Sequence, residues 1–128
     1  MTQRKLQQIV NKWQAILRLQ DWEVEAVAVQ AEYTDLIDGN TGLCERRTNH
    51  HIARITIAVK QSAEKVEEDV LHELLHVKLA PLWALHLNLR SLLGSSAQEL
   101  ATSCWTDTEE PFINDLVQAL LGVHGYGC

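Results

Sequence analysis

The chain has 128 residues, 46% of them hydrophobic and 22% charged, which is the composition of one globular domain covering residues 1–128. Its formal charge of −6 argues against a nucleic-acid partner, because phosphate binding needs clustered lysines and arginines, and the pairs Arg4-Lys5 and Arg46-Arg47 are too short. Three cysteines without paired spacing do not indicate a disulfide framework, and neither a signal peptide nor a run of about 20 apolar residues is seen, so we expect a cytoplasmic protein with no membrane partner.

The first predicted element is an amphipathic helix over residues 2–19, where apolar side chains recur at helical spacing. Three stretches with strand character follow, at residues 21–29, 42–47 and 52–59, and the first and last of them alternate with a period of two. Strands this close along the chain predict a twisted, antiparallel or mixed three-stranded sheet.

The hydrophobic period changes to that of a helix after Ser62, which can cap the helix N-terminus ahead of several acidic side chains. Pro81 is expected to end or kink this helix, because proline lacks the amide hydrogen that a helix interior needs. The helix therefore contains the stretch VLHELLHVKLAP, which begins at Val70.

Further helices are expected in the second half of the chain. One covers residues 82–94, a short one opens with the capping pair Ser96 and Glu99, and a last one runs over residues 108–121 with Pro111 in its first turn. The order of an N-terminal helix, strands, and then helices predicts an α+β fold.

The stretch VLHELLHVKLAP carries the pattern His-Glu-x-x-His at His72, Glu73 and His76. Residues four apart lie one above the other on a helix, so the two imidazoles can reach one metal ion. Imidazole suits zinc, whose catalytic sites hold three protein ligands and a water, and Glu73 can accept a proton from that water as it attacks a carbonyl. The competing interpretation is that the three residues are ordinary side chains of a helix.

A third zinc ligand is expected on the last helix, in the stretch EEPFINDLVQALL. Glu110 is the preferred ligand, and Asn114 one turn later is placed to hydrogen-bond to it. Glu109 is the alternative ligand. An acidic pair near a helix N-terminus can also serve only the helix dipole. Two other side chains are weaker ligand candidates, because His86 lies beyond Pro81 and Glu99 is explained by capping.

The order of these elements and motifs resembles the small zincin-type metallopeptidases of phages and mobile elements, namely the minigluzincins and, more distantly, the ImmA/IrrE-type peptidases. The glutamate helix of the latter is similar at Glu110, Ile113, Asn114, Leu116, Val117, Leu120 and Leu121. The resemblance implies a twisted sheet over an active-site helix and a glutamate helix. It also implies a gluzincin-type zinc site and an edge strand, near Cys44 or Val59, that aligns a peptide or protein substrate. Pro111 directly after the proposed ligand departs from the family pattern, and we expect no effector domain beside the peptidase domain.

Peptide hydrolysis also calls for a group that stabilises the negative charge that develops on the carbonyl oxygen. His124 and Tyr126, which follow the glutamate helix, are the candidates for this oxyanion stabiliser. The alternative is that the glycine-rich segment GVHGYGC is a frayed end without a role.

The sequence thus predicts a zinc-dependent metallopeptidase and leaves two alternatives open. One is a non-catalytic zinc-binding or protein-interaction module on a degenerate peptidase fold, in which Glu73 has no chemical role. The other is a peptide deformylase-like amidase, because the stretch GLC places Cys44 upstream of the histidine motif as a thiolate ligand.

Overall fold

The computed structural model describes residues 1–30 and 42–124, and it confirms the predicted α+β class with an N-terminal helix first, a mixed sheet, and a C-terminal helix last. The elements are α1 (Gln3–Ile16), β1 (Glu23–Val29), β2 (Gly42–Arg47), the 3-10 turn η3 (Thr48–His50), β3 (Ile52–Ala58), α2 (Ala63–Lys78), α3 (Ala80–Arg90) and α4 (Ser95–His124). They form two compact units, Met1–Lys78 and Leu79–Cys128, which are described in turn. The expectation of one domain over residues 1–128 stays a prediction.

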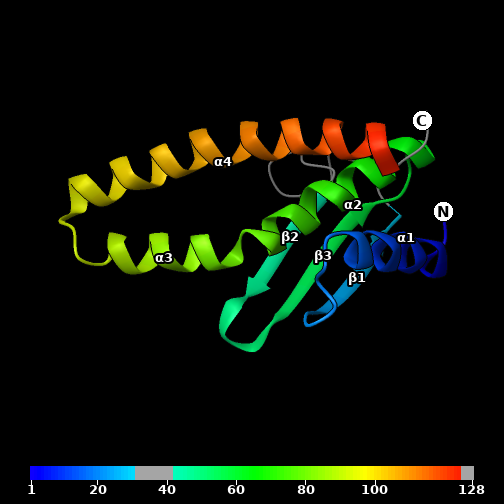
Figure 1. Cartoon of the computed structure of the whole chain (residues 1–128), viewed down its shortest axis with the longest axis horizontal. Coiled ribbons are helices and arrows are strands. Elements are labelled where there is room, and N and C mark those ends of the chain that lie inside the picture. Colours follow the sequence, from blue (N-terminus) through cyan, green and yellow to red (C-terminus); the bar gives the residue numbers. More distant parts are fainter. Residues whose placement is uncertain (31–41, 125–128) are drawn as a thin grey trace. The chain divides into compact units, whose positions relative to one another are not determined.

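The sheet of the first unit has the strand order β1-β3-β2, so the central strand is the last of the three in the sequence (Figure 1). Strand β3 runs parallel to β1 and antiparallel to β2, which is the mixed form of the predicted sheet. Pairing of β1 with β3 continues past the strand ends, where Val59 donates a backbone hydrogen bond of 3.0 Å to the Val29 carbonyl.

One face of the sheet is apolar and the other is polar, because side chains alternate along each strand. In β3 the side chains of Ile55 and Ile57 are fully buried, whereas Arg54 is exposed and pairs with Glu25 of β1 at 3.1 Å. Residues directly opposite one another in a sheet share a face. On the buried face Gly42 is paired with Ile57, Cys44 with Ile55, and Arg46 with Ala53.

Helices α1 and α2 cover the sheet of this unit, with α1 packed on β1 and α2 on β2 and β3. The N-terminus of α1 is capped by Thr2, and its stripe of Leu6, Val10 and Trp13 is fully buried. The two helices are joined through Glu67 of α2, whose carboxylate accepts hydrogen bonds of 2.8 Å from the Trp13 indole and 2.7 Å from the Lys12 ammonium group.

Both ends of α2 follow the chemistry expected from the sequence. The hydroxyl of Ser62 accepts a 3.2 Å hydrogen bond from the Lys65 amide, so this serine caps the helix N-terminus. The helix ends at Lys78, and Pro81 then lies in the first turn of α3, where its missing amide hydrogen has no consequence. The predicted break at Pro81 is therefore confirmed.

The second unit is a pair of helices, α3 and α4, joined by a short turn (Figure 1). The prediction of two separate helices after this turn is wrong, because α4 is continuous from Ser95 to His124 and Pro111 lies inside it. Proline removes one hydrogen bond from a helix, but the buried side chains of Ile113 and Val117 continue beyond it at helical spacing. Within the described residues, no helix is both long enough and apolar enough to cross a membrane.

Candidate metal centre

The histidine motif lies on α2, as the hydrophobic period of the sequence predicts. Leu71, Leu74 and Leu75 are buried around it, which fixes how the helix is rotated about its axis. His72 and His76 are therefore held on one side, half-buried, with ring centroids 5.1 Å apart and an angle of 63° between the ring planes. Two imidazole rings thus lie one helical turn apart on the same side of α2.

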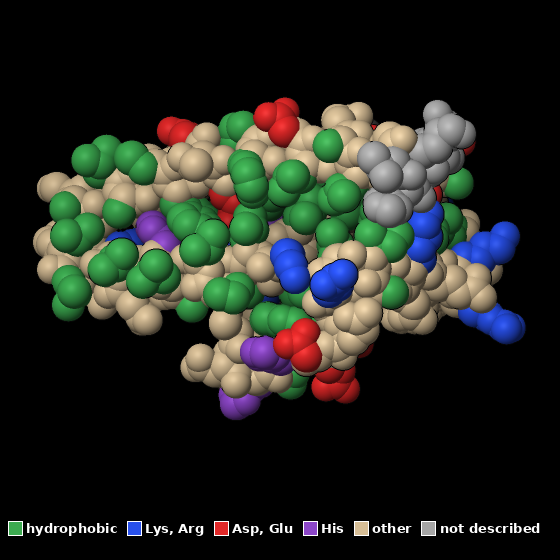
Figure 2. All heavy atoms as spheres, viewed as in Figure 1, with side chains coloured by type: hydrophobic (Ala, Val, Ile, Leu, Met, Phe, Trp, Pro, Cys, Tyr) green, Lys and Arg blue, Asp and Glu red, His purple; other side chains and the backbone are tan. Residues whose placement is uncertain are grey.

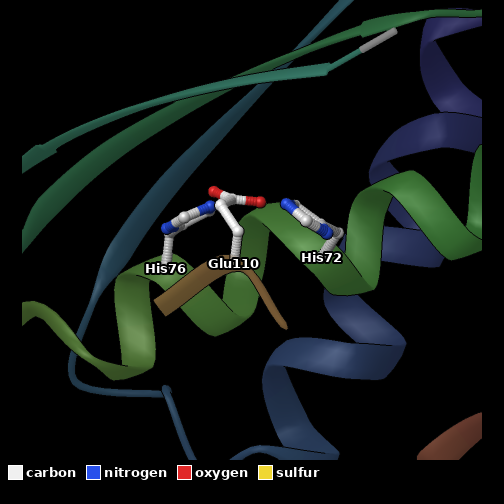
Figure 3. A group of neighbouring side chains, drawn as sticks. All are labelled: His72, His76 and Glu110. Carbon is white, nitrogen blue, oxygen red and sulfur yellow. The ribbon is translucent and has the colours of Figure 1, made fainter. Parts of the chain in front are cut away.

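His72, His76 and Glu110 form a group that could hold a metal ion (Figure 3). One ligand atom from each residue lies within 4.8 Å of those of the other two, and all three side chains are half-buried. Two imidazoles with one carboxylate form a donor set typical of catalytic zinc, because a fourth position is left for water or substrate. Among the described residues this is the one such group of histidine, cysteine, aspartate or glutamate side chains.

Glu109, the alternative ligand, is buried but does not belong to the group. Neighbouring residues of a helix point about 100° apart, and Glu109 precedes the buried residues Ile113 and Val117 by one and two turns. It therefore lies on the apolar side of α4. Asn114, proposed to support the ligand, follows Glu110 by one turn and is exposed, so its supporting role stays a prediction.

The other predicted ligand candidates also lie outside the metal group. The imidazole of His86 on α3 stacks against two indole rings, with its centroid 5.3 Å from that of Trp83 and 5.0 Å from that of Trp105. Cys44 is half-buried on β2, and the described residues contain no group that joins its thiol to the two histidines. The thiolate ligand expected of a deformylase-like site is therefore not part of the group that the structure assembles.

His124 and Tyr126 are the residues predicted to stabilise an oxyanion. His124 is the last residue of α4, and Tyr126 lies outside the described residues. Their role stays a prediction.

Glu73 lies between the two histidines in the sequence and is buried against β2. A side chain at Gly42 would place its Cβ atom 3.0 Å from Oε1 of Glu73, 3.2 Å from its Cγ, and 3.3 Å from Cδ1 of Ile57. Ordinary contacts between carbon atoms are 3.5 to 4.0 Å. The absence of a side chain at Gly42 therefore lets the strand backbone lie directly against the Glu73 carboxyl group.

Arg46 is a second residue of β2 that supports the motif. Its Nη1 atom donates a hydrogen bond to the backbone carbonyl of His76. This carbonyl lies in the last turn of α2, where a cation suits the helix dipole. This role of Arg46 is not evident from the sequence, although the period of two along β2 places Gly42, Cys44 and Arg46 on one face.

A polar cluster around Asp69 holds the turn of α2 that precedes the motif. The Asp69 carboxylate is buried and accepts hydrogen bonds of 2.9 Å from Lys65 and 2.8 Å from Gln61. Partial burial lowers the pKa of Lys65, but its hydrogen bond and charge attraction to Asp69 outweigh this effect, so the pKa is raised above its ordinary value. Lys65 therefore stays charged at neutral pH.

Comparison with known proteins adds no relative. No family model, no curated protein and no solved structure matches the chain. The resemblance to minigluzincins and ImmA/IrrE-type peptidases therefore rests on the motifs alone, and the function has to be argued from the residues of this site.

Proposed function

We propose that this protein is a zinc-dependent metallopeptidase. The observation that carries the proposal is the grouping of His72, His76 and Glu110, with one ligand atom of each within 4.8 Å of the others. Tetrahedral zinc with bonds of about 2.1 Å holds its ligand atoms roughly 3.4 Å apart, so small side-chain rotations bring the three atoms to bonding distance. A bound zinc ion supplies a Lewis acid that lowers the pKa of a water molecule and polarises a carbonyl group.

Glu73 is the residue that moves the proton. It follows His72 directly, so on the helix it is turned about 100° away from that ligand and can face the attacking water without binding the metal. Its carboxylate accepts a proton from the water as the oxygen bonds to the peptide carbonyl carbon. The same group then donates the proton to the amine nitrogen as the carbon–nitrogen bond breaks, which returns Glu73 to its ionised form.

Strand β2 is the element that we expect to align the peptide. It is an edge strand of the described sheet, and an extended peptide can bind to such an edge through backbone hydrogen bonds. The inner face of β2 contacts the motif helix at both ends, through Gly42 beside Glu73 and Arg46 at the carbonyl of His76. A peptide paired with β2 would therefore run alongside the two histidines. Of the two residues expected near the substrate-aligning edge, Val59 follows the central strand β3, whereas Cys44 lies on the edge strand β2. Cys44 therefore marks the edge that we expect to bind the peptide.

The experiment that tests this function compares the wild type with Glu73→Gln. Both proteins are purified without chelator, their zinc content is measured by mass spectrometry, and cleavage is followed on a library of quenched fluorescent peptides. We expect equal zinc contents and a loss of cleavage by about 10²- to 10⁴-fold in the variant, because glutamine cannot accept the proton.

Three results would overturn the peptidase assignment. Zinc binding without cleavage in the wild type would favour the non-catalytic module, and unchanged cleavage in Glu73→Gln would remove Glu73 from the mechanism. Loss of zinc in Cys44→Ala would favour the deformylase-like alternative, because the thiolate would then be a ligand.

A further inference from the structure

Helix α3 and the turn after it carry an exposed row of leucines that the metallopeptidase proposal does not use. We call the four residues Leu82, Leu85, Leu89 and Leu92 the leucine seam. Each is more than half exposed, and Leu93 beside them is 42% exposed. Hydrophobic side chains gather over α3 and the turn that follows it (Figure 2). A concentration of this kind on one short helix marks a contact surface rather than the scattered leucines of an ordinary exterior.

The spacing of the leucine seam is that of a coiled coil. The steps from Leu82 to Leu85, Leu89 and Leu92 are three, four and three residues, which are the successive a and d positions of a heptad repeat. Leu82, Leu85 and Leu89 lie within α3, and Leu92 follows in the turn after it, where its amide donates a 3.2 Å hydrogen bond to the Leu89 carbonyl three residues earlier. A narrow a/d stripe fits the side chains of one further helix.

The partner of the seam is not α4, because α3 uses another face for that helix. On that face His86 stacks with Trp105 of α4 at 5.0 Å between ring centroids, and Trp83 contacts the same indole at 5.6 Å with the two rings tilted by 54°. One turn further on, Arg90 donates a 3.0 Å hydrogen bond to the Thr102 hydroxyl of α4. The aromatic face thus joins the two helices of the unit, and in the part of the chain that the structure describes the leucine face is exposed.

The scarcity of charged residues around the leucine seam favours an uncharged partner surface, such as the seam of a second copy. Arg90 is the one charged residue, apart from a histidine, between Ala80 and Gly94, and the positions flanking the seam include Asn88, so no ion pairs are available to choose a charged helix. The formal charge of −6 disfavours an anionic membrane surface. Two antiparallel copies of α3 would hold their Arg90 residues about 9 Å apart along the axis. This is roughly one Debye length, so salt screens much of the repulsion between the two charges.

The area is sufficient for a modest interface. Leu93 and the seam together expose roughly 500 Å² per chain, which matches the largest apolar patch of a typical monomer. A second copy would double the buried area to about 1,000 Å², the low end of specific interfaces. A twofold axis uses the same patch on both chains, so the contact closes as a dimer and does not extend into a fibre.

We propose that the leucine seam pairs with the seam of a second copy of this chain, so that two α3 helices form a short antiparallel coiled coil. In this arrangement Leu85 of each copy packs beside Leu89 of its partner, and Leu82 beside Leu92. The expected dissociation constant is on the order of 10 to 100 µM, because fewer than two heptads are buried.

Sedimentation equilibrium of the full chain tests this proposal over about 5 to 500 µM, a range that brackets the expected dissociation constant. The weight-average mass is expected to rise from 14.5 kDa towards twice that value. The double variant Leu85→Gln/Leu89→Gln is expected to weaken association at least about 100-fold. Phe112→Gln is the matched control, because Phe112 is 51% exposed on α4 and lies outside the seam, so this variant should dimerise as the wild type does.

Circular dichroism establishes that the variants keep their helices, and the concentration dependence of the wild type tests the proposal without any variant. A wild type that stays at 14.5 kDa throughout the range would overturn the proposal. So would a folded double variant that associates like the wild type, or a monomer whose seam instead binds phosphatidylcholine vesicles in a flotation assay.

Discussion

Replacing Gly42 by alanine tests whether β2 positions the carboxylate of Glu73. The added methyl carbon would meet Oε1 of Glu73 at 3.0 Å and Cδ1 of Ile57 at 3.3 Å. Both side chains are buried, and Ile57 is fully enclosed in the core, so the flexible Glu73 side chain is the one that has to move. Restoring ordinary contact distances displaces its carboxylate by roughly 0.5 Å.

A displacement of this size matters more for catalysis than for stability. Misplacing a reacting group by about 1 Å costs about 100-fold in rate, so we expect kcat/KM of Gly42→Ala to fall about 10- to 100-fold, or about 1.4 to 2.7 kcal/mol of transition-state stabilisation. Zinc affinity should change less than about threefold, because the substitution does not touch His72, His76 or Glu110. The free energy of unfolding should fall by about 1 to 2 kcal/mol from overpacking.

The assay compares peptide cleavage, zinc titration and urea denaturation for the wild type, Gly42→Ala and Gly94→Ala. Gly94 is the matched control, because a Cβ atom there would meet nothing within 4 Å. Wild-type cleavage by Gly42→Ala would refute the positioning argument. A parallel loss of zinc affinity and cleavage would also refute it, since the substitution would then disturb the whole motif and not Glu73 alone.

Three further predictions concern the residues and the metal around the motif. Arg46→Met should lower the free energy of unfolding by about 1 to 2 kcal/mol in urea denaturation, because the His76 carbonyl loses a charged donor; an unchanged midpoint would contradict this role. Because the pKa of Lys65 is raised in the fold, its pairing with Asp69 stabilises the protein below the ordinary lysine pKa and stops doing so as the pH rises through the raised value. The difference in Tm between the wild type and Lys65→Met should therefore be constant near neutral pH and shrink only in strongly alkaline solution. A chelator should lower the Tm by about 10 °C relative to zinc at a hundredfold excess over its dissociation constant, and the Tm of Glu110→Gln should not respond.

The local chemistry of the chain was readable from the sequence because it depends on near neighbours. The cap at Ser62, the break before Pro81 and the placement of the histidine motif on a helix follow from residue type and period alone. The strand order was not readable, since the parallel pairing of β1 with β3 skips the strand between them. The sequence predicts a separate last helix that begins near Thr108 with Pro111 in its first turn, whereas α4 is continuous from Ser95, because the preference of proline for a first turn takes no account of the buried side chains beyond it.

The candidate metal site, too, could be predicted from the sequence only in part. Both glutamates of the stretch EEPFIND are candidates in the sequence, but which of them joins the histidines depends on how α4 is rotated about its axis, and that is set by which of its side chains are buried. The buried residues Ile113 and Val117 place Glu109 on the apolar side, and Glu110 is the residue found in the metal group. The contact of Gly42 with Glu73 was equally out of reach, because it depends on the distance between a strand and a helix.

Zinc binding by single-residue variants tests the central claim most directly. Zinc affinity is measured by competition with a chromogenic chelator for the wild type, Glu110→Gln and Glu109→Gln, each shown by circular dichroism to be folded. We predict one zinc per chain in the wild type and in Glu109→Gln, and at least about a 100-fold loss of affinity in Glu110→Gln. A wild type that binds no zinc, or a loss in Glu109→Gln with Glu110→Gln unaffected, would contradict the account.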